Sequence, residues 1–84
     1  MNKKRYKEPL KEETETTINV IYDMEKLCIY TNKVSLQKQL NKLLGEPIKE
    51  YKNKRSISGS MWEIHFCEKN KISKLILKAN IFEL

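Results

Sequence analysis

Two stretches in the first third of the chain alternate apolar and polar residues with the period of a β-strand. In residues 17–22 every second residue is Ile, Val or Tyr, and residues 27–31 resume the alternation with Leu27 and Ile29 on one face. A period of two is typical of a strand with one buried face, and β-branched and aromatic residues favour strands. Residues 23–26 suit a turn, so the two stretches are predicted to pair as an antiparallel hairpin.

The next segment changes to the period of a helix. Ser35 is a good N-cap residue, and Gly45 followed by Pro47 is a typical end of a helix. Between them, leucines recur at intervals that place them on one stripe of a helix. These leucines are Leu36, Leu40, Leu43 and Leu44.

The second half of the chain is predicted to repeat this order. Residues 48–54 read as a lysine-rich strand, which suits the edge of a sheet. Residues 56–60 read as a flexible connection in which Gly59 supplies the turn. Residues 61–66 alternate again, with Trp62 pointing inward together with Ile64 and Phe66, and predict a further strand.

A second helix is predicted to start at Asn70. Its apolar stripe and its lysine-bearing side follow the same period as the first helix. The stripe comprises Ile72, Leu75, Ile76 and Ala79, and the lysines are Lys71, Lys74 and Lys78. Residues 81–84 are apolar, and either pack back on the domain or add a short strand.

Together these elements predict an α+β domain over residues 15–84. Two hairpin-helix units (ββαββα) would form one four-stranded antiparallel sheet with both helices on one face. Residues 1–14 have no period of 2 or 3.6 and are interpreted as a mobile basic tail. The alternative arrangement is that this small chain pairs with a copy of itself. A domain of this size has a thin core, so a deep active-site cleft is not expected.

The charge is positive and uneven along the chain. There are 17 Lys and Arg against 11 Asp and Glu, a formal net charge of +6, and all but two of the basic residues are lysine. Residues 33–56 hold seven basic residues against Glu46 and Glu50. A lysine-rich surface favours loose, salt-sensitive attraction to a polyanion over bidentate reading of bases. The alternative is that the lysines only keep the protein soluble.

Catalytic and metal-binding chemistry lacks its usual residues. His65 is the only histidine, and Cys28 and Cys67 form no C-x-x-C motif, so a zinc site is not expected and both thiols are interpreted as reduced. There is no glycine-rich phosphate loop. Glu50 and Lys52 make a nuclease-like E-x-K triplet, which is expected by chance in a lysine-rich chain. We therefore predict a protein that is not an enzyme and needs no cofactor.

The chain shows no membrane or secretion signal. No run approaches the ~18 apolar residues of a membrane span. The basic start is not followed by the apolar region of a signal peptide. These features predict a cytoplasmic protein that does not insert into a membrane.

Binding is the remaining activity. If the helices cover one face of the sheet, the other face is a partly aromatic platform that can stack nucleic-acid bases or hold a protein partner, unless it is itself covered. This platform comprises Thr17, Asn19, Ile21, Cys28, Tyr30, Met61, Glu63 and His65. The candidate contact residues are the basic set Lys38, Lys42, Lys49, Lys52, Lys54 and Arg55, with Tyr30, Tyr51 and His65 as platform groups.

Four short runs resemble a group of small uncharacterised proteins that phages and mobile elements of low-GC Gram-positive bacteria carry. The runs are Glu15-Thr-Thr-Ile18, Ile29-Tyr-Thr31, Leu44-Gly-Glu-Pro47 and Trp62-x-Ile-x-Phe66. The resemblance implies a setting in which small proteins inhibit host defence, as anti-CRISPR proteins do, or assist DNA binding. Many such inhibitors are acidic mimics of DNA, and a chain of charge +6 departs from that type.

The sequence thus favours a non-catalytic inhibitor or adaptor from a phage or mobile element. Its expected target is a protein or ribonucleoprotein complex that processes nucleic acid, gripped through the nucleic acid or through an acidic protein surface. The alternative is an accessory protein that binds DNA or RNA directly with its lysine-rich surface.

Overall fold

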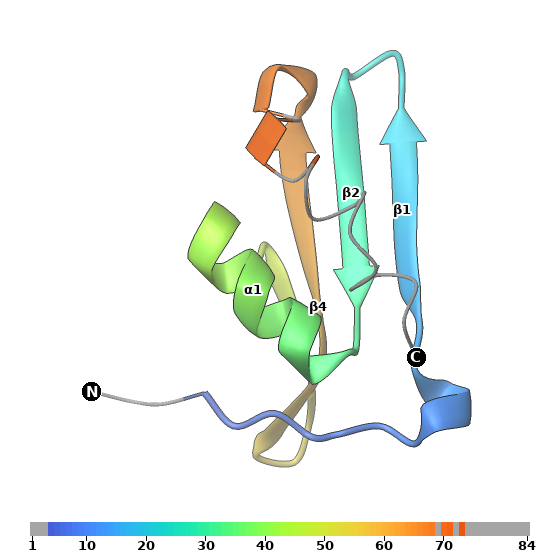
Figure 1. The fold of residues 1–84 in the computed structure, drawn as a ribbon, viewed down its shortest axis with the longest axis vertical. Coiled ribbons are helices and arrows are strands. Elements are labelled where there is room, and N and C mark those ends of the chain that lie inside the picture. Colours follow the sequence, from blue (N-terminus) through green and yellow to red (C-terminus); the bar gives the residue numbers. More distant parts are fainter. Residues whose placement is uncertain (1–3, 69, 72, 74–84) are drawn as a thin grey trace.

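The computed structural model describes residues 4–68, 70, 71 and 73, which form a four-stranded antiparallel sheet with a helix on one face (Figure 1). The sheet order is β1-β2-β4-β3. The elements are η1 (Lys11–Glu13), β1 (Thr16–Ile21), β2 (Lys26–Thr31), α1 (Val34–Leu44), β3 (Lys49–Asn53), β4 (Ser56–His65) and η2 (Phe66–Glu68). The predicted α+β class is therefore confirmed.

The first hairpin forms as predicted. β1 and β2 pair antiparallel, with Thr16 opposite Thr31 and Ile21 opposite Lys26. The turn occupies residues 22–25, one residue earlier than predicted, so Tyr22 lies outside the strand and is 78% exposed.

The predicted flexible connection over residues 56–60 is wrong, because these residues are the first half of the ten-residue strand β4. The chain turns earlier, at Lys54 and Arg55, and residues 49–53 form the predicted edge strand. Gly59 lies within β4 beneath the ring of Tyr30. A Cβ atom at Gly59 would lie 2.6 Å from the Tyr30 hydroxyl oxygen, so this glycine serves close packing and not a turn.

A bulge shifts the pairing of β3 with β4. Tyr51 pairs with Gly59, but the next residue, Lys52, pairs with Ile57. Ser58 is therefore the extra residue, and its hydroxyl donates a hydrogen bond of 3.0 Å to the Tyr51 carbonyl oxygen. Such a bulge moves the residues beyond it onto the opposite face. It thereby places Ile57 on the face that α1 covers, where it is buried.

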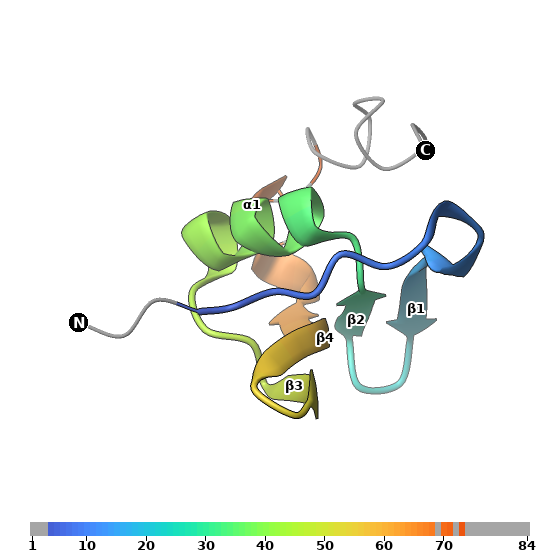
Figure 2. The same cartoon turned by 90° about the horizontal axis from the view of Figure 1, so that it is seen from below.

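The helix α1 covers one face of the sheet and closes the core (Figure 2). The core consists of Ile29, Leu36, Leu40, Trp62 and Ile64. Of the predicted leucine stripe, Leu43 is the exception, because it is 44% exposed while Gln37 is buried. The predicted capping by Ser35 is also wrong. The helix starts two residues earlier, at Val34, with Lys33 at the N-cap and without a side-chain cap.

The end of α1 is fixed as the sequence predicts. Gly45 has a positive φ of 86°, and its N–H donates a 2.9 Å hydrogen bond to the Asn41 carbonyl oxygen. The Gly45 carbonyl oxygen accepts a 3.0 Å hydrogen bond from the indole N–H of Trp62 on β4. The same tryptophan therefore fills the core and ties the end of the helix to the sheet.

Several predictions concern the two ends of the chain. Most of the predicted second helix lies outside the described residues, as do residues 81–84; Asn70, Lys71 and Ser73 have helical backbone. Phe66, predicted to extend a strand, begins η2 and packs edge-on against Tyr22. The segment predicted as a mobile tail makes defined contacts from Lys4 onward, which are described below.

Candidate binding surface

The two-residue turn between β3 and β4 carries Lys54 and Arg55 at one end of the sheet. Both side chains are exposed. Lys54 has a φ of 61°, a left-handed conformation that side chains other than glycine, asparagine and aspartate rarely adopt. A positive φ at the first central residue of a two-residue hairpin loop is common to type I′ and type II′ turns, in which glycine or asparagine is favoured. The chain thus carries a cation where turn geometry favours glycine.

The N-terminal segment adds a third cation to this end. It runs alongside the start of β4, where Tyr6 forms a parallel bridge with Ile57. The Ile57 N–H donates to the Arg5 carbonyl oxygen at 2.6 Å, and the Lys7 N–H donates to the Ile57 carbonyl oxygen at 2.9 Å. Lys7 is thereby held next to the turn.

Contacts with α1 and β3 hold the N-terminal segment in place. The Tyr6 hydroxyl accepts a 2.7 Å hydrogen bond from the side-chain amide of Asn41 on α1. The ammonium of Lys4 lies 2.7 Å from a carboxylate oxygen of Glu46 and 2.7 Å from one of Glu50. Partial burial acts to lower the pKa of Lys4, but the two carboxylates outweigh it and raise that pKa. The cluster of Lys4, Glu46 and Glu50 therefore keeps one net negative charge.

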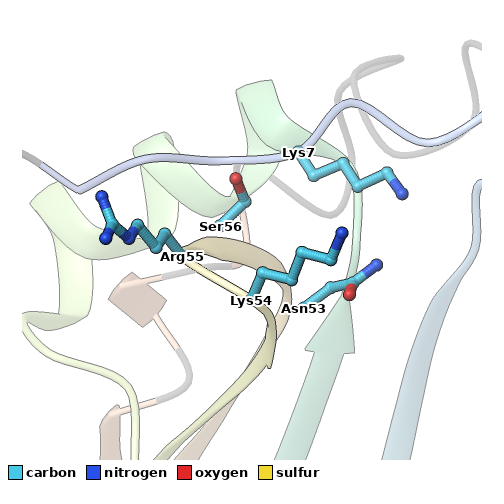
Figure 3. Close-up of a pocket in the computed structure, with 5 residues that line it drawn as sticks. All are labelled: Lys7, Asn53, Lys54, Arg55 and Ser56. Atoms are coloured by element: carbon cyan, nitrogen blue, oxygen red, sulfur yellow. The ribbon is translucent and has the colours of Figure 1, made fainter.

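The N-terminal segment and the β3–β4 turn border a shallow hollow of about 430 Å³ (Figure 3). Its lining residues are Lys7, Asn53, Lys54, Arg55 and Ser56. In Figure 3 the ammonium of Lys54 extends toward the N-terminal segment that bears Lys7, whereas Arg55 extends along that segment in the other direction. The lining has three cations and no carboxylate, and none of the three forms an ion pair with another described residue. Ammonium and guanidinium groups are donors that suit phosphate oxygens.

The nine predicted contact residues divide between different parts of the fold. Lys52, Lys54 and Arg55 come together at the β3–β4 turn. Lys38 and Lys42 lie on the exposed side of α1, on the other side of the sheet from Tyr30 and Tyr51. His65 pairs with Lys26 at the opposite end of the sheet, so it takes no part in the hollow. The structure thus assembles only a subset of the predicted residues.

Sequence reasoning missed Lys7, Asn53 and Ser56. Lys7 belongs to a segment without periodicity, so its position depends on pairing with a strand about fifty residues later. The one available signal is Tyr6, a single aromatic residue within a charged run.

The predicted platform on the other face of the sheet is present. Strand pairing places its eight residues on the face opposite α1, and adds Lys49 and Tyr51 from β3. The rings of Tyr30 and Tyr51 meet edge-to-face, with centroids 5.5 Å apart and an interplanar angle of 81°. The ammonium of Lys49 lies 4.9 Å from the Tyr51 ring centroid, a cation–π distance. Burial, then the charge of Glu15 and the neighbouring Tyr51, raise the pKa of Tyr30.

An acidic group of this face, Glu63 on β4, lies toward the end of the sheet that holds the β1–β2 turn. Glu63 forms a 2.9 Å ion pair with Lys26. The Cys28 thiol lies 3.8 Å from a Glu63 oxygen, and burial together with that carboxylate raises the pKa of Cys28. A raised thiol pKa disfavours the thiolate that a cysteine nucleophile requires. Across the described ranges, no group of three or more His, Cys, Asp or Glu residues is placed to hold a metal ion.

Comparisons with protein-family models, curated proteins and solved structures found no match. Among the helical residues described, no helix is long and apolar enough to cross a membrane. Inferences about function therefore rest on the residues themselves.

Proposed function

We propose that the protein is a non-catalytic inhibitor or adaptor of a phage or mobile element, acting on a complex that processes nucleic acid. It would bind that complex by contacting the phosphate backbone with the basic end of the sheet, defined as Lys7, Lys52, Lys54 and Arg55. The observation that carries the proposal is the convergence of Lys7, Lys54 and Arg55 around one hollow without a carboxylate.

The electrostatics support an anionic ligand. Like charges brought together without counter-charges repel one another and oppose folding, so an anion would relieve that repulsion. Lys4 pairs with the nearby carboxylates of Glu46 and Glu50 and leaves one net negative charge, which is less than the positive charge of the basic end. The hollow is shallow and exposed, which suits a backbone phosphate better than a small molecule that requires enclosure.

The alternative is a protein that binds DNA or RNA directly, outside any complex. The same cations would serve both functions, so the two differ in whether a protein surface of the complex adds to the binding. An inhibitor that also docks on protein would bind the assembled complex much more tightly than the free nucleic acid, and with less dependence on salt.

The proposal also covers the C-terminal segment, the location of the protein in the cell and its oligomeric state. Residues 70–80 would form a second helix on the α1 side of the sheet, with Ile72, Leu75, Ile76 and Ala79 facing the core; backbone chemical shifts test this. The protein would act in the cytoplasm of its host. Its oligomeric state can be measured by light scattering, because pairing with a second copy stays an alternative.

Fluorescence anisotropy with labelled duplex DNA, single-stranded DNA and structured RNA tests the proposal. Wild-type protein is expected to bind at about 50 mM salt and much more weakly at about 200 mM. The variant K54E/R55E should lose most of this binding. The control K11E/K71E lowers the formal net charge from +6 to +2 just as K54E/R55E does, but away from the hollow. If both variants lose the same amount of affinity, the loss comes from the lower net charge alone, and the basic end is rejected as the contact surface.

A further inference from the structure

The aromatic part of the outer sheet face lies next to the basic end. Tyr51 on β3 precedes Lys54 of the β3–β4 turn by three residues. Three residues span about 10 Å along an extended strand. Tyr30 lies against Tyr51 across β4, with ring centroids 5.5 Å apart. Both rings are half-buried, so each is fixed by packing yet keeps part of its surface accessible.

The sheet is shaped to hold these rings. Gly59 leaves the space that the Tyr30 ring occupies, because an added Cβ would lie within 3.0 Å of three of its atoms. Glycine in the interior of a strand destabilises the strand. The packing of the Tyr30 ring against Gly59 explains why glycine is nevertheless found in the middle of β4. Lys49, an exposed residue, brings a further positive charge to the Tyr51 ring.

We propose that Tyr51 and Tyr30 stack the unpaired bases of a single-stranded nucleic acid whose phosphates lie on Lys49 and the basic end. The inference rests on the proposed function and adds the class of nucleic acid. Aromatic rings beside a positively charged groove are how proteins bind single strands without reading sequence. In a duplex the base faces are stacked inside the helix, so the rings would favour a single strand over a duplex.

The charge of the outer face limits where the strand lies. Lys49, Lys54 and Arg55 border the β3 side, whereas Glu15 lies next to β1, and Glu63 of β4 is paired with Lys26 toward the opposite end of the sheet from the basic end. A polyanion is therefore attracted to β3 and the basic end, and gains nothing by extending over β1. This asymmetry favours a nucleic acid on Tyr51 first, with Tyr30 as the inner ring.

The test compares probes that share phosphates but differ in bases. Labelled single-stranded dT12, an abasic 12-mer with the same backbone, and a 12-base-pair duplex are titrated in parallel by anisotropy. Stacking of one base on an aromatic ring is worth roughly 5- to 150-fold in affinity. Wild-type protein should bind dT12 at least about 5-fold more tightly than the abasic strand, and Tyr51→Leu should reduce this ratio toward one.

Matched variants separate stacking from folding. Tyr51→Trp keeps an aromatic face and should retain the preference for dT12. Tyr22→Leu removes a tyrosine that is 78% exposed at the other end of the sheet, and should change nothing. Thermal unfolding of each variant checks that the fold persists.

The outcomes distinguish the two proposals. Equal binding of dT12 and the abasic strand by wild-type protein overturns base stacking but leaves phosphate binding intact. Binding of the duplex as tightly as dT12 also overturns the inference, as does an equal loss for both strands in Tyr51→Leu. Failure to bind all three probes would reject direct nucleic-acid contact itself. Conversion of a dimer to a monomer by Tyr51→Leu, without a change in probe preference, would assign this face to a second copy.

Discussion

Replacing Lys54 by glycine should make the protein more stable and a weaker binder at the same time. Lys54 has a φ of 61°, in the left-handed region that costs a residue with a Cβ about 1–2 kcal/mol. Glycine avoids this cost, but it also increases the conformational entropy of the unfolded chain, which lowers the free energy of unfolding by about 0.4–1 kcal/mol. The net expectation is a gain of about 0.5–1 kcal/mol in the free energy of unfolding. For a domain of this size that raises Tm by about 2–8 °C.

The same substitution removes one cation from the hollow. Each lost phosphate contact makes the plot of log Kobs against log salt shallower by about 0.7–0.9. Calorimetry or thermal unfolding measures the first effect, and anisotropy over a salt series measures the second. A gain in stability together with a shallower slope is the predicted result.

Glu25 offers a matched control. It has a φ of 51° in the turn at the other end of the sheet, and its backbone carbonyl accepts a 2.8 Å hydrogen bond from the Phe66 N–H, which glycine would keep. Glu25→Gly should therefore gain similar stability while the salt slope stays unchanged. An unchanged slope in Lys54→Gly would show that Lys54 touches no phosphate. A lower Tm in Lys54→Gly would refute the reasoning about the turn.

Three further predictions concern the sheet and its core. Burial raises the pKa of Tyr30 above its ordinary value of 10.0, so an ultraviolet titration should contain a tyrosine that ionises above pH 10. The pKa of Tyr30 is raised only in the folded state, so its contribution to stability is complete below pH 10 and is lost as pH rises through the folded-state pKa. A free energy of unfolding that does not fall over this pH range would contradict the prediction. Iodoacetamide should alkylate the exposed Cys67 before Cys28, whose pKa is raised by burial, and mass spectrometry after brief labelling would show the reverse order if this is wrong. Ser60→Ala should cost about 1–3 kcal/mol in urea unfolding, because the Ser60 hydroxyl donates a 2.7 Å hydrogen bond to the side-chain amide oxygen of the buried Gln37. Adding Gln37→Leu should recover part of that loss, and additive losses would contradict the pairing.

Local pattern was sufficient for the elements whose faces differ in polarity. The first hairpin and α1 each have one apolar face, so their periods are visible in the sequence and the structure contains them. The lysines of residues 49–53 likewise indicate an edge strand, and β3 lies at the edge of the sheet. The N-cap was misplaced because the helix starts without a side-chain cap, which leaves no residue type to mark it.

Elements that depend on distant residues could not be predicted. The first half of β4 contains Ser58, Gly59 and Ser60, a composition typical of a turn. Gly59 is explained only by Tyr30, and Ser60 only by Gln37, and each pair is more than twenty residues apart in the chain. The bulge at Ser58 further hides the period of two.

The candidate site shows the same division. The density of lysine between residues 33 and 56 indicated Lys54 and Arg55, because charge is visible in composition. The position of Lys7 follows from a parallel bridge between Tyr6 and Ile57, which no local pattern reveals. Sequence also grouped Lys38 and Lys42 with the others, although the sheet separates them from the outer face.

An NMR titration of ¹⁵N-labelled protein with a short single strand at about 50 mM salt tests the central claim most directly, since it locates the contact residue by residue. We expect amide shift changes at Lys7 and residues 53–56 first, extending to Tyr51. These changes should disappear when salt is raised to about 200 mM. Changes confined to α1 around Lys38 and Lys42, or to the β1–β2 turn, would contradict the claim that the basic end binds the nucleic acid. The absence of any change would contradict nucleic-acid contact altogether.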